Sequence, residues 1–440
     1  MSRRPHASET ETSPLLNGDA EPAPPTQQDS PPPPPPPPPS QTFKIFATMS
    51  SFLTLGLFNS SLGALLPLLT KHYHLTDLSV SCIFLASPIG YMLAAQASAA
   101  MHLRYGQRGI AVAGPVCQIL ATVAAAMHPS FGWLLVAFVV QGVGMGLLDG
   151  SWCAWAGGME RGNTVSGLLH GSYSVGGAGA PWLVTVLLEE KGWGWWRWYW
   201  GLAAACTVSL ILLTAAFRNE DATSYRRNNT SALLATTTIT TNPATTKPLF
   251  AHPATWFCAA YFLTYVGTET TISGWLVSFM YRYRHLSLSQ SGLTSSGYWI
   301  GMATGRLLLG YATDKIGVRR ATTFYFFVAI TIEAAFAVVT SSTASVALMV
   351  MLGFVMGPLF PSGVVVLTRL LPGEVHVKAV SFVASLGQVG GAVLPFAIGA
   401  VVEGVGIGVF RWAILAQTVV AVGVWVAFAR LRPWGVRDGV

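Results

Sequence analysis

The sequence has 440 residues, of which 52% are apolar and only 10% carry a charged side chain. About a quarter of the residues in an average soluble domain are charged, so this composition excludes a water-soluble globular protein. The net charge of +7 comes from Lys and Arg scattered over the polar breaks between apolar segments, which excludes the continuous basic stripe of a nucleic-acid-binding protein.

Residues 1–42 are rich in Pro, Ser and Glu and contain few apolar side chains. Nine consecutive prolines, Pro31 to Pro39, stand where the apolar core of a signal peptide would have to be. Such a segment cannot bury enough apolar surface to fold, so we expect a disordered cytosolic tail.

A short motif in this tail, Glu11-Thr-Ser-Pro-Leu15-Leu16, has the acidic-dileucine form. It resembles the adaptor-binding signals that sort proteins to lysosome-like or vacuolar membranes. Six-residue matches of this kind also occur by chance. The motif therefore suggests an adaptor as a partner and leaves the plasma membrane and the vacuolar membrane as alternatives.

The rest of the chain contains twelve apolar segments, each long enough for the roughly 20 residues that cross a bilayer. They are predicted at 43–69, 77–101, 108–128, 131–157, 165–189, 197–217, 253–280, 290–312, 320–340, 343–370, 375–402 and 409–430. The expected fold is an all-α, multi-pass membrane protein with twelve transmembrane helices.

The Lys and Arg residues between these segments predict the orientation of the chain. Of the 25 Lys and Arg residues, eighteen fall on the side of the N-terminus, six on the opposite side, and Arg306 inside a segment. Positive residues accumulate on the cytosolic side of membrane proteins. We therefore expect both termini to be cytosolic, with residues 431–440 as a second tail.

The two halves of the chain look like copies of one another. An offset of 211 residues brings Gly56, Gly63, Gly106 and Gly146 onto other glycines, and Val175-Gly-Gly-Ala-x-x-Pro181 recurs at an offset of 214 as Val389-Gly-Gly-Ala-x-x-Pro395. Parallel repeats are common in transporters. We expect two pseudo-symmetric six-helix bundles at 43–217 and 253–430, joined by a cytosolic linker at 218–252.

Ionisable residues inside the predicted helices are candidates for function because a buried charge in a bilayer is costly. Asp149 and Glu269 are the strongest, with Glu333 and His170 as weaker candidates. A carboxylate in a partly dry cavity can take up a proton from one side and release it on the other. We predict proton coupling at Asp149 and Glu269, with helix packing as the alternative.

Aromatic and amide side chains in the middle of the predicted helices could bind a polar organic solute by stacking and hydrogen bonding, although each could also serve helix packing. The candidates for this cavity are Asn59, Trp152, Tyr173, Trp275, Phe360 and Gln388. The five cysteines show no metal-ligand spacing, and no nucleophile–base pair is apparent. No cofactor, metal or enzymatic activity is therefore predicted.

One loop carries a family resemblance. Gly305-Arg-x-x-x-Gly310-Tyr-Ala-Thr-Asp314-Lys-Ile-Gly317-Val-Arg319-Arg320 resembles the loop signature of the major facilitator superfamily. In that superfamily the loop holds one conformation of the carrier, which implies gating roles for Gly310, Asp314, Gly317, Arg319 and Arg320. The corresponding loop of the first half has Leu103 where the acidic residue belongs.

The segment Tyr265-Val-Gly-Thr-Glu269-x-x-x-x-Gly274-Trp275 resembles the fucose–proton symporter-like branch of the superfamily, which includes fungal proteins of the bypass-of-stop-codon-6 type. This resemblance implies a sugar-like substrate and proton symport. Asp149 matches the acidic residue of the fourth helix in that branch. The first helix offers only Asn59 and no carboxylate.

Taken together, these features predict a monomeric secondary transporter that moves a small organic solute by alternating access. Within transport, the alternative is efflux of a hydrophobic or secondary metabolite. From a different class of protein, the alternative is a membrane receptor or sensor that has kept the carrier fold but does not transport.

Overall fold

A computed structural model describes residues 40–159, 162–228, 250, 252–371 and 376–431 of the chain. The predicted sorting motif (Glu11, Leu15 and Leu16) and most of the predicted linker lie outside these ranges. Within them the chain is helical and contains no β-strand. The α-helices are α1 (Gln41–Tyr73), α2 (Asp77–Ser81), α3 (Ile83–Ala126), α4 (Phe131–Gly157), α5 (Gly162–Glu189), α6 (Trp195–Ala216), α7 (Ala222–Asn228), α10 (Pro253–Arg282), α11 (Leu288–Ile316), α12 (Val318–Val338), α13 (Ser342–Met356), α14 (Leu359–Leu370), α15 (His376–Val405) and α16 (Phe410–Ala429).

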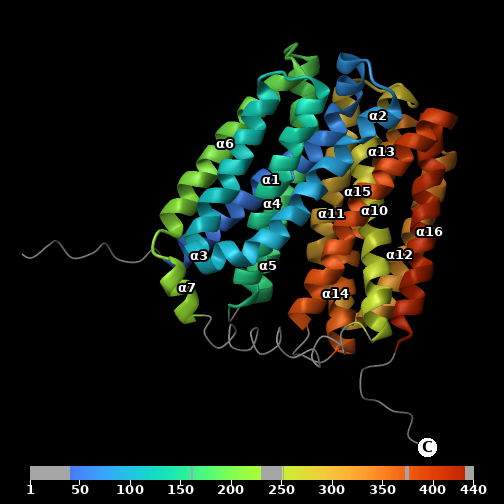
Figure 1. The fold of residues 1–440 in the computed structure, drawn as a ribbon. Helices are drawn as coiled ribbons and strands as arrows, with labels where there is room; N and C mark the ends of the chain where they lie inside the picture. The colour runs from blue at the N-terminus through green and yellow to red at the C-terminus, as the bar shows by residue number, and fades with distance from the viewer. Residues whose placement is uncertain (1–39, 160–161, 229–249, 251, 372–375, 432–440) are drawn as a thin grey trace, which may run out of the picture. The chain divides into compact units, whose positions relative to one another are not determined.

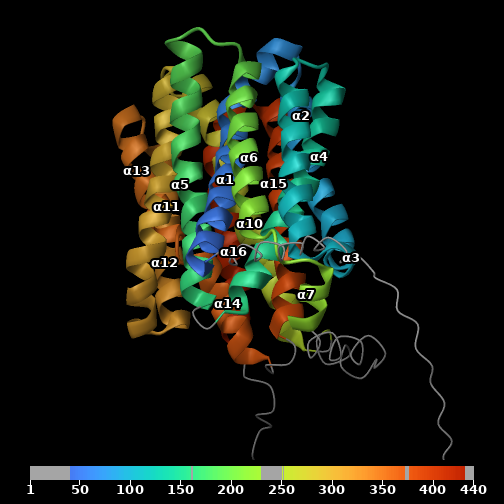
Figure 2. The same cartoon turned by 90° about the vertical axis from the view of Figure 1, so that its left-hand side faces the viewer.

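The long helices run side by side, as Figures 1 and 2 show from two directions. The short helix α2 lies at the upper end in Figure 1, and α7 and α14 lie at the lower end. We call these the α2 end and the α7 end. By the charge bias of the sequence, the α7 end is the predicted cytosolic side.

The helical segments account for the twelve predicted crossings. Eight are long and apolar enough to span a membrane, and one of them, Asp77–Ala126, is 50 residues long and splits into two helices at Gly106. The long helices α5, α10 and α11 complete the set. Helices satisfy their own backbone hydrogen bonds, which is required in lipid. The predicted fold, an all-α protein with twelve transmembrane helices in two six-helix bundles, is confirmed.

The internal repeat corresponds to equivalent packing in both bundles. Helix α1 packs against α5 and α6, and α10 packs in the same way against α15 and α16. Gly176 of α5 lies against the backbone of Leu53, and its repeat partner Gly390 of α15 lies against the backbone of Leu263. A Cβ atom at either glycine would overlap the facing helix, so the repeated glycines permit close helix approach.

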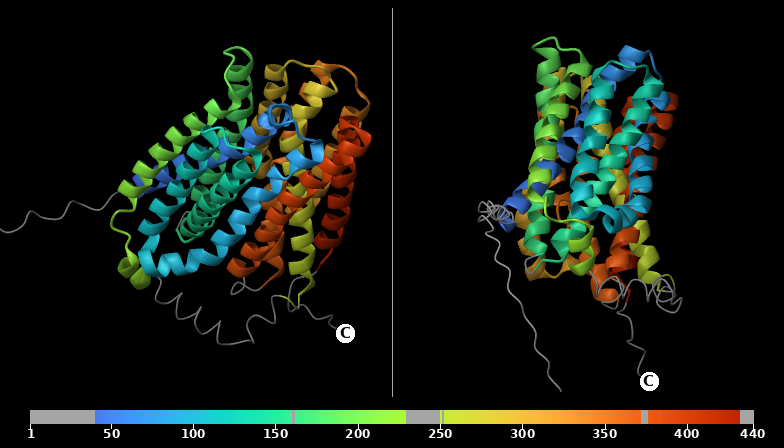
Figure 3. Two further views of the ribbon diagram at one scale, coloured as in Figure 1. Left: turned by 45° about the horizontal axis from the view of Figure 1, so that its top comes forward. Right: turned by 60° about the vertical axis from the view of Figure 1, so that its left-hand side comes forward.

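The long α3 bends at the α7 end, where the chain passes close to the segment before α7 (Figure 3). Gly106 has φ 69° and ψ −168°, and a Cβ atom there would fall on the backbone of Asp221. The Arg108 N–H donates to the carbonyl of Glu220 at 3.0 Å. Asp221 accepts a hydrogen bond from the Ser224 N–H at 2.8 Å, which caps α7 and lowers the pKa of the Asp221 carboxyl.

A side chain at Gly106 is disfavoured for two reasons, its positive φ and the nearby backbone of Asp221, and three glycines allow the two effects to be separated. Gly106 combines a positive φ with a crowded neighbour, Gly317 has φ 96° but faces open space, and Gly310 is helical and faces open space. We expect Gly106→Ala to lower the thermal midpoint most and Gly317→Ala to lower it less, since a strained backbone alone costs about 1–3 kcal/mol. Gly310→Ala should be neutral or stabilising by up to about 1 kcal/mol. Thermal unfolding in detergent, followed by tryptophan fluorescence, checks the order, and equal midpoints for Gly106→Ala and Gly310→Ala would contradict it.

Candidate functional site

Asp149 of α4 lies among neutral hydrogen-bonding groups. The Tyr91 hydroxyl donates to Oδ2 at 2.8 Å, and the thiol of Cys153, one helical turn further along α4, lies 3.6 Å from Oδ1. The same Cys153 Sγ lies 3.8 Å from Nε2 of His170 on α5. No ion pair of Asp149 is present among the described residues. The two described partners of the Asp149 carboxylate are therefore a hydroxyl and a thiol.

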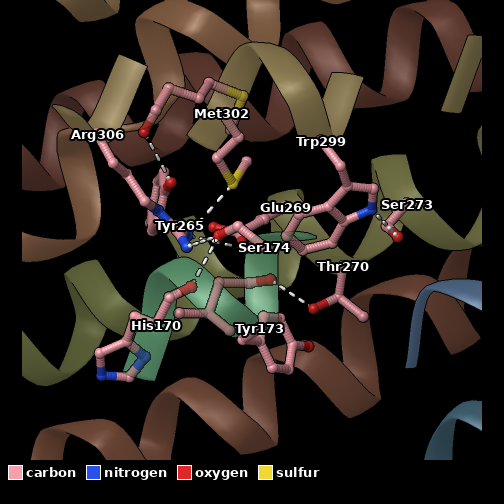
Figure 4. Close-up of polar contacts among 12 residues, drawn as sticks. His170, Tyr173, Ser174, Tyr265, Glu269, Thr270, Ser273, Trp299, Met302 and Arg306 are labelled. Atoms are coloured by element: carbon pink, nitrogen blue, oxygen red, sulfur yellow. Dashed lines mark hydrogen bonds and ion pairs between the residues drawn. The ribbon is translucent and has the colours of Figure 1, made fainter. Parts of the chain in front are cut away.

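Glu269 of α10 faces the guanidinium group of Arg306 on α11 (Figure 4). Arg306 Nη2 lies 3.6 Å from Glu269 Oε1, and the two side chains are 22% and 15% exposed. Arg306 Nη1 donates to the Ser174 hydroxyl of α5 at 2.9 Å, and Nη2 lies 3.2 Å from the sulfur of Met302. The ion pair is long, and both of its side chains are mostly buried.

The two acidic residues belong to different bundles, and α5 and α11 connect them. Ser174, which binds Arg306, donates its own hydroxyl to the carbonyl of His170 at 2.9 Å. A series of polar contacts therefore runs from Asp149 through Cys153 to His170, and from the His170 carbonyl through Ser174 and Arg306 to Glu269. We call this series the polar path, and it crosses the contact between the two halves of the molecule.

An aromatic and amide cluster lies beside this path. The Asn59 side-chain amide donates to the Tyr173 hydroxyl at 3.0 Å, and the Tyr173 ring packs edge-on against Trp299 with centroids 6.0 Å apart. The Trp299 indole donates to the Ser273 hydroxyl at 3.1 Å. Asn59 and Tyr173 were predicted from the sequence, whereas Trp299 and Ser273 were not.

The contacts given for the other four predicted cavity residues are with other parts of the described chain, and their place in a cavity stays a prediction. Trp152 is fully buried and stacks on Phe217 at 4.4 Å. Trp275 is fully buried and donates to the carbonyl of Pro395 at 2.9 Å, which joins α10 to α15. Phe360 packs edge-on against a phenylalanine of α10 at 4.8 Å, and Gln388 is half-buried in α15. Both tryptophans hold neighbouring helices together.

Glu333 lies away from the path, between α12 and α16. It is fully buried, and one carboxyl oxygen accepts a hydrogen bond from Thr418 at 2.8 Å. The other oxygen, Oε2, has no hydrogen-bond partner within the described chain. This residue therefore offers a buried acid for comparison with Asp149 and Glu269.

The sequence model described as Major Facilitator Superfamily matches residues 47–283 and 257–434, which together span most of the chain. The chain belongs to the major facilitator superfamily. It is therefore a multi-pass membrane transporter, as the loop signature and the helix count predicted.

Two relatives match the chain at low identity. The chain is 26% identical over 389 residues to "Bypass of stop codon protein 6" of Saccharomyces cerevisiae, which covers 83% of this chain and 78% of the relative. It is 27% identical over 267 residues to an uncharacterized MFS-type transporter of Yersinia pestis, which covers 59% of this chain and 64% of that protein.

Two solved structures share the fold. The crystal structure of a D-xylose-proton symporter has a TM-score of 0.69 at 14% identity and covers 90% of this chain and 100% of that chain. A bacterial homolog of the human lysosomal transporter Spinster, in an inward-facing and occupied conformation, has a TM-score of 0.65 at 13% identity and covers 90% and 99%. At these identities the likeness concerns the fold alone.

The superfamily loop is tighter than the sequence suggested. Residues 313–319 were expected to form a loop, but α11 continues to Ile316 and α12 begins at Val318. The single residue Gly317 turns the chain because φ 96° is accessible to glycine. Arg319 donates to the carbonyl of Leu431 at 3.0 Å, Arg320 is exposed, and the side chain of Asp314 lies outside the described part.

At the α2 end the two halves are joined by a pair of equivalent contacts. Glu189 at the end of α5 accepts a hydrogen bond from the Ser289 N–H at the start of α11, at 2.6 Å. Glu403 near the end of α15 accepts one from the Leu78 N–H at the start of α2, at 2.8 Å. The acids are 214 residues apart and the donors 211, which are the offsets of the repeat. A carboxylate at a helix N-terminus is stabilised by the helix dipole.

A third contact at the α2 end is an ion pair. Arg282 at the end of α10 binds Asp77 of α2 with both guanidinium nitrogens, at 2.6 and 3.0 Å. On the other side, the Trp182 N–H of α5 donates to the Ser296 hydroxyl of α11 at 3.0 Å. These contacts hold the α2 end of the two bundles together.

Several of these residues were missed because they carry little signal in a single sequence. Tyr91, Cys153 and Ser174 are ordinary residues in apolar helices, and only their partners make them part of the site. Glu189 and Glu403 could have been found, because the offset that aligns the repeated Val-Gly-Gly-Ala motif also aligns these two acids.

Proposed function

We propose that the chain is a proton-coupled secondary transporter of a small polar organic solute, with a sugar-like molecule as the solute class. The observation that carries the proposal is the polar path from Asp149 to Glu269. It joins two membrane-embedded carboxylates, one from each bundle, through Cys153, His170, Ser174 and Arg306. Ionisable groups in such positions serve proton or ion pathways in membrane carriers.

In the proposed mechanism, protons exchange at Asp149, whose partners are the Tyr91 hydroxyl and the Cys153 thiol. The imidazole of His170 contacts that thiol. Arg306 contacts Glu269 in its own half through Nη2 and Ser174 in the other half through Nη1. Protonation of Glu269 would remove its attraction for Arg306 and change the contact between the bundles. Proton uptake and conformational change are thereby linked.

The contacts at the α2 end suggest which state of the transport cycle this structure represents. With both termini cytosolic, the halves meet on the side away from the cytosol, so this arrangement would be the inward-facing state. The solute would then bind at the Asn59, Tyr173 and Trp299 cluster, where aromatic faces and an amide suit a polar ring.

The role of that cluster is checked by Asn59→Ala, Tyr173→Phe and the double variant. We expect each single change to raise the apparent KM about fivefold, since one neutral hydrogen bond contributes about 1 kcal/mol. Because the two side chains share that bond, the double variant should be little worse than either single variant. A lowered thermal midpoint at unchanged KM would instead assign the pair to helix packing.

The proposed function is tested by a thermal-shift screen of the purified chain against sugars and lipophilic metabolites, followed by uptake into proteoliposomes. We expect a polar, sugar-like compound to stabilise the protein and an inward or outward pH gradient to drive its accumulation. Stabilisation by lipophilic compounds alone would favour efflux of a hydrophobic metabolite. Transport that is unchanged by a protonophore would overturn proton coupling.

A further inference from the structure

An open groove of about 510 Å³ runs between α12 and α16 at the α7 end of the molecule. Two aromatic side chains that line it, Phe324 and Phe327, are 63% and 57% exposed. The groove therefore opens on the outer surface of the bundle, away from the polar path. Its principal lining residues are Arg319, Arg320, Phe324, Phe327, Val426 and Arg430.

One end of the groove is strongly basic. Arg319 and Arg320 lie in the first turn of α12, and Arg430 follows the last residue of α16. Among the residues whose side chains are described, no carboxylate forms an ion pair with any of the three. Arg319 uses one N–H for the Leu431 carbonyl, and a guanidinium group has five N–H donors. The positive end of α12 adds to the same field.

The other end of the groove is apolar. Arg320, Phe324 and Phe327 stand at spacings of four and three residues, which places them on one face of α12. At 1.5 Å per residue, Phe327 lies about 10 Å deeper along the helix than Arg320. The Trp425 indole donates to Thr323 at 3.0 Å and ties α16 to α12 beneath the groove.

We propose that this groove binds one anionic phospholipid, with the phosphate between Arg320 and Arg430 and an acyl chain along Phe324, Phe327 and Val426. Charge complementarity identifies the headgroup, because three neighbouring guanidinium groups at one end of the groove attract an anion. The aromatic face identifies the tail, since it continues the groove in the direction of the hydrocarbon core. The predicted orientation places the groove in the cytosolic leaflet, where anionic lipids are abundant.

Native mass spectrometry of the full-length chain tests this site with palmitoyl-oleoyl phosphatidylserine and phosphatidylcholine of the same acyl chains. We expect one retained phosphatidylserine with at least about tenfold preference over phosphatidylcholine, and loss of that preference in Arg320→Gln/Arg430→Gln. Arg104→Gln/Arg108→Gln removes the same charge from the first-half loop and should retain the preference. Glycerophosphoserine, which has the headgroup without acyl chains, should not compete.

A second measurement needs no variant. Phosphatidylserine with a photoactivatable group in its acyl chain should label α12 and α16 around Phe324, Phe327 and Val426. Labelling spread evenly over the outer surface would overturn the proposal, as would equal loss of lipid preference in both arginine pairs. Full competition by glycerophosphoserine would show a site for small anions instead of a lipid.

Discussion

Proteoliposomes that contain the Asp149→Asn/Glu269→Gln protein are expected to lose at least about 90% of pH-driven solute accumulation. Both changes keep the size of the side chain and remove the titratable oxygen, so the polar path keeps its shape but can no longer carry a proton. Exchange of labelled for unlabelled solute across the same vesicles needs no net proton movement. We expect it to persist within about threefold of wild type. The comparison of accumulation with exchange separates coupling from binding.

The matched control is Glu333→Gln, the same change at an acid that contacts Thr418 and lies outside the path. It should leave pH-driven accumulation within about twofold of wild type, once the midpoint of thermal unfolding shows that the protein is folded. If Asp149→Asn/Glu269→Gln shows no loss of coupling, the two carboxylates do not take part in the mechanism. Equal losses in the control and in the double variant would point to a general effect of neutralising buried acids.

Arg306 offers a further check on the same path, because Glu269→Gln leaves its guanidinium group without its acidic partner. Loss of one member of a membrane-embedded charge pair is costly, and removal of both is less so. Glu269→Gln/Arg306→Gln should therefore be more thermally stable than Glu269→Gln, although neither should accumulate solute. A lower thermal midpoint for Glu269→Gln/Arg306→Gln than for Glu269→Gln would contradict this account.

The second large effect is expected at the α2 end, where Glu189→Gln/Glu403→Gln should weaken both acid-to-helix contacts at once. Each carboxylate at a helix N-terminus contributes about 0.3–1 kcal/mol, so the two together should shift the conformational equilibrium about tenfold toward opening at this end. Hydrogen–deuterium exchange reports directly on the two amides concerned, those of Leu78 and Ser289. Both should exchange faster in the double variant.

The single variants show whether the two contacts act as one gate. If they do, Glu189→Gln alone should accelerate exchange at Leu78 as well as at Ser289, because opening breaks both contacts. Glu190→Gln is the matched control, since it neutralises the adjacent, exposed acid. Acceleration confined to the nearest amide would show two independent local contacts and would remove the gate from the proposed cycle.

The amino-acid sequence by itself determined the number of crossings, the two copies and the family. These follow from local properties: apolar segments of bilayer length, a repeated Val-Gly-Gly-Ala motif and the loop that ends in Arg319-Arg320. It also marked Asp149 and Glu269, because a charged residue in an apolar segment stands out without any partner. Their role in proton coupling stays a prediction.

Only the tertiary structure decided which side chains meet. Trp152, Tyr173 and Trp275 look equivalent in the sequence, since each is an aromatic residue in the middle of a helix. The structure places Tyr173 beside Asn59 and Trp299, and surrounds the other two with neighbouring helices. Helical periodicity tells which residues share a face, but the partner of that face depends on the packing of helices that are far apart in the chain. For the same reason the path through His170 and Arg306 to Glu269 became visible only in the folded molecule.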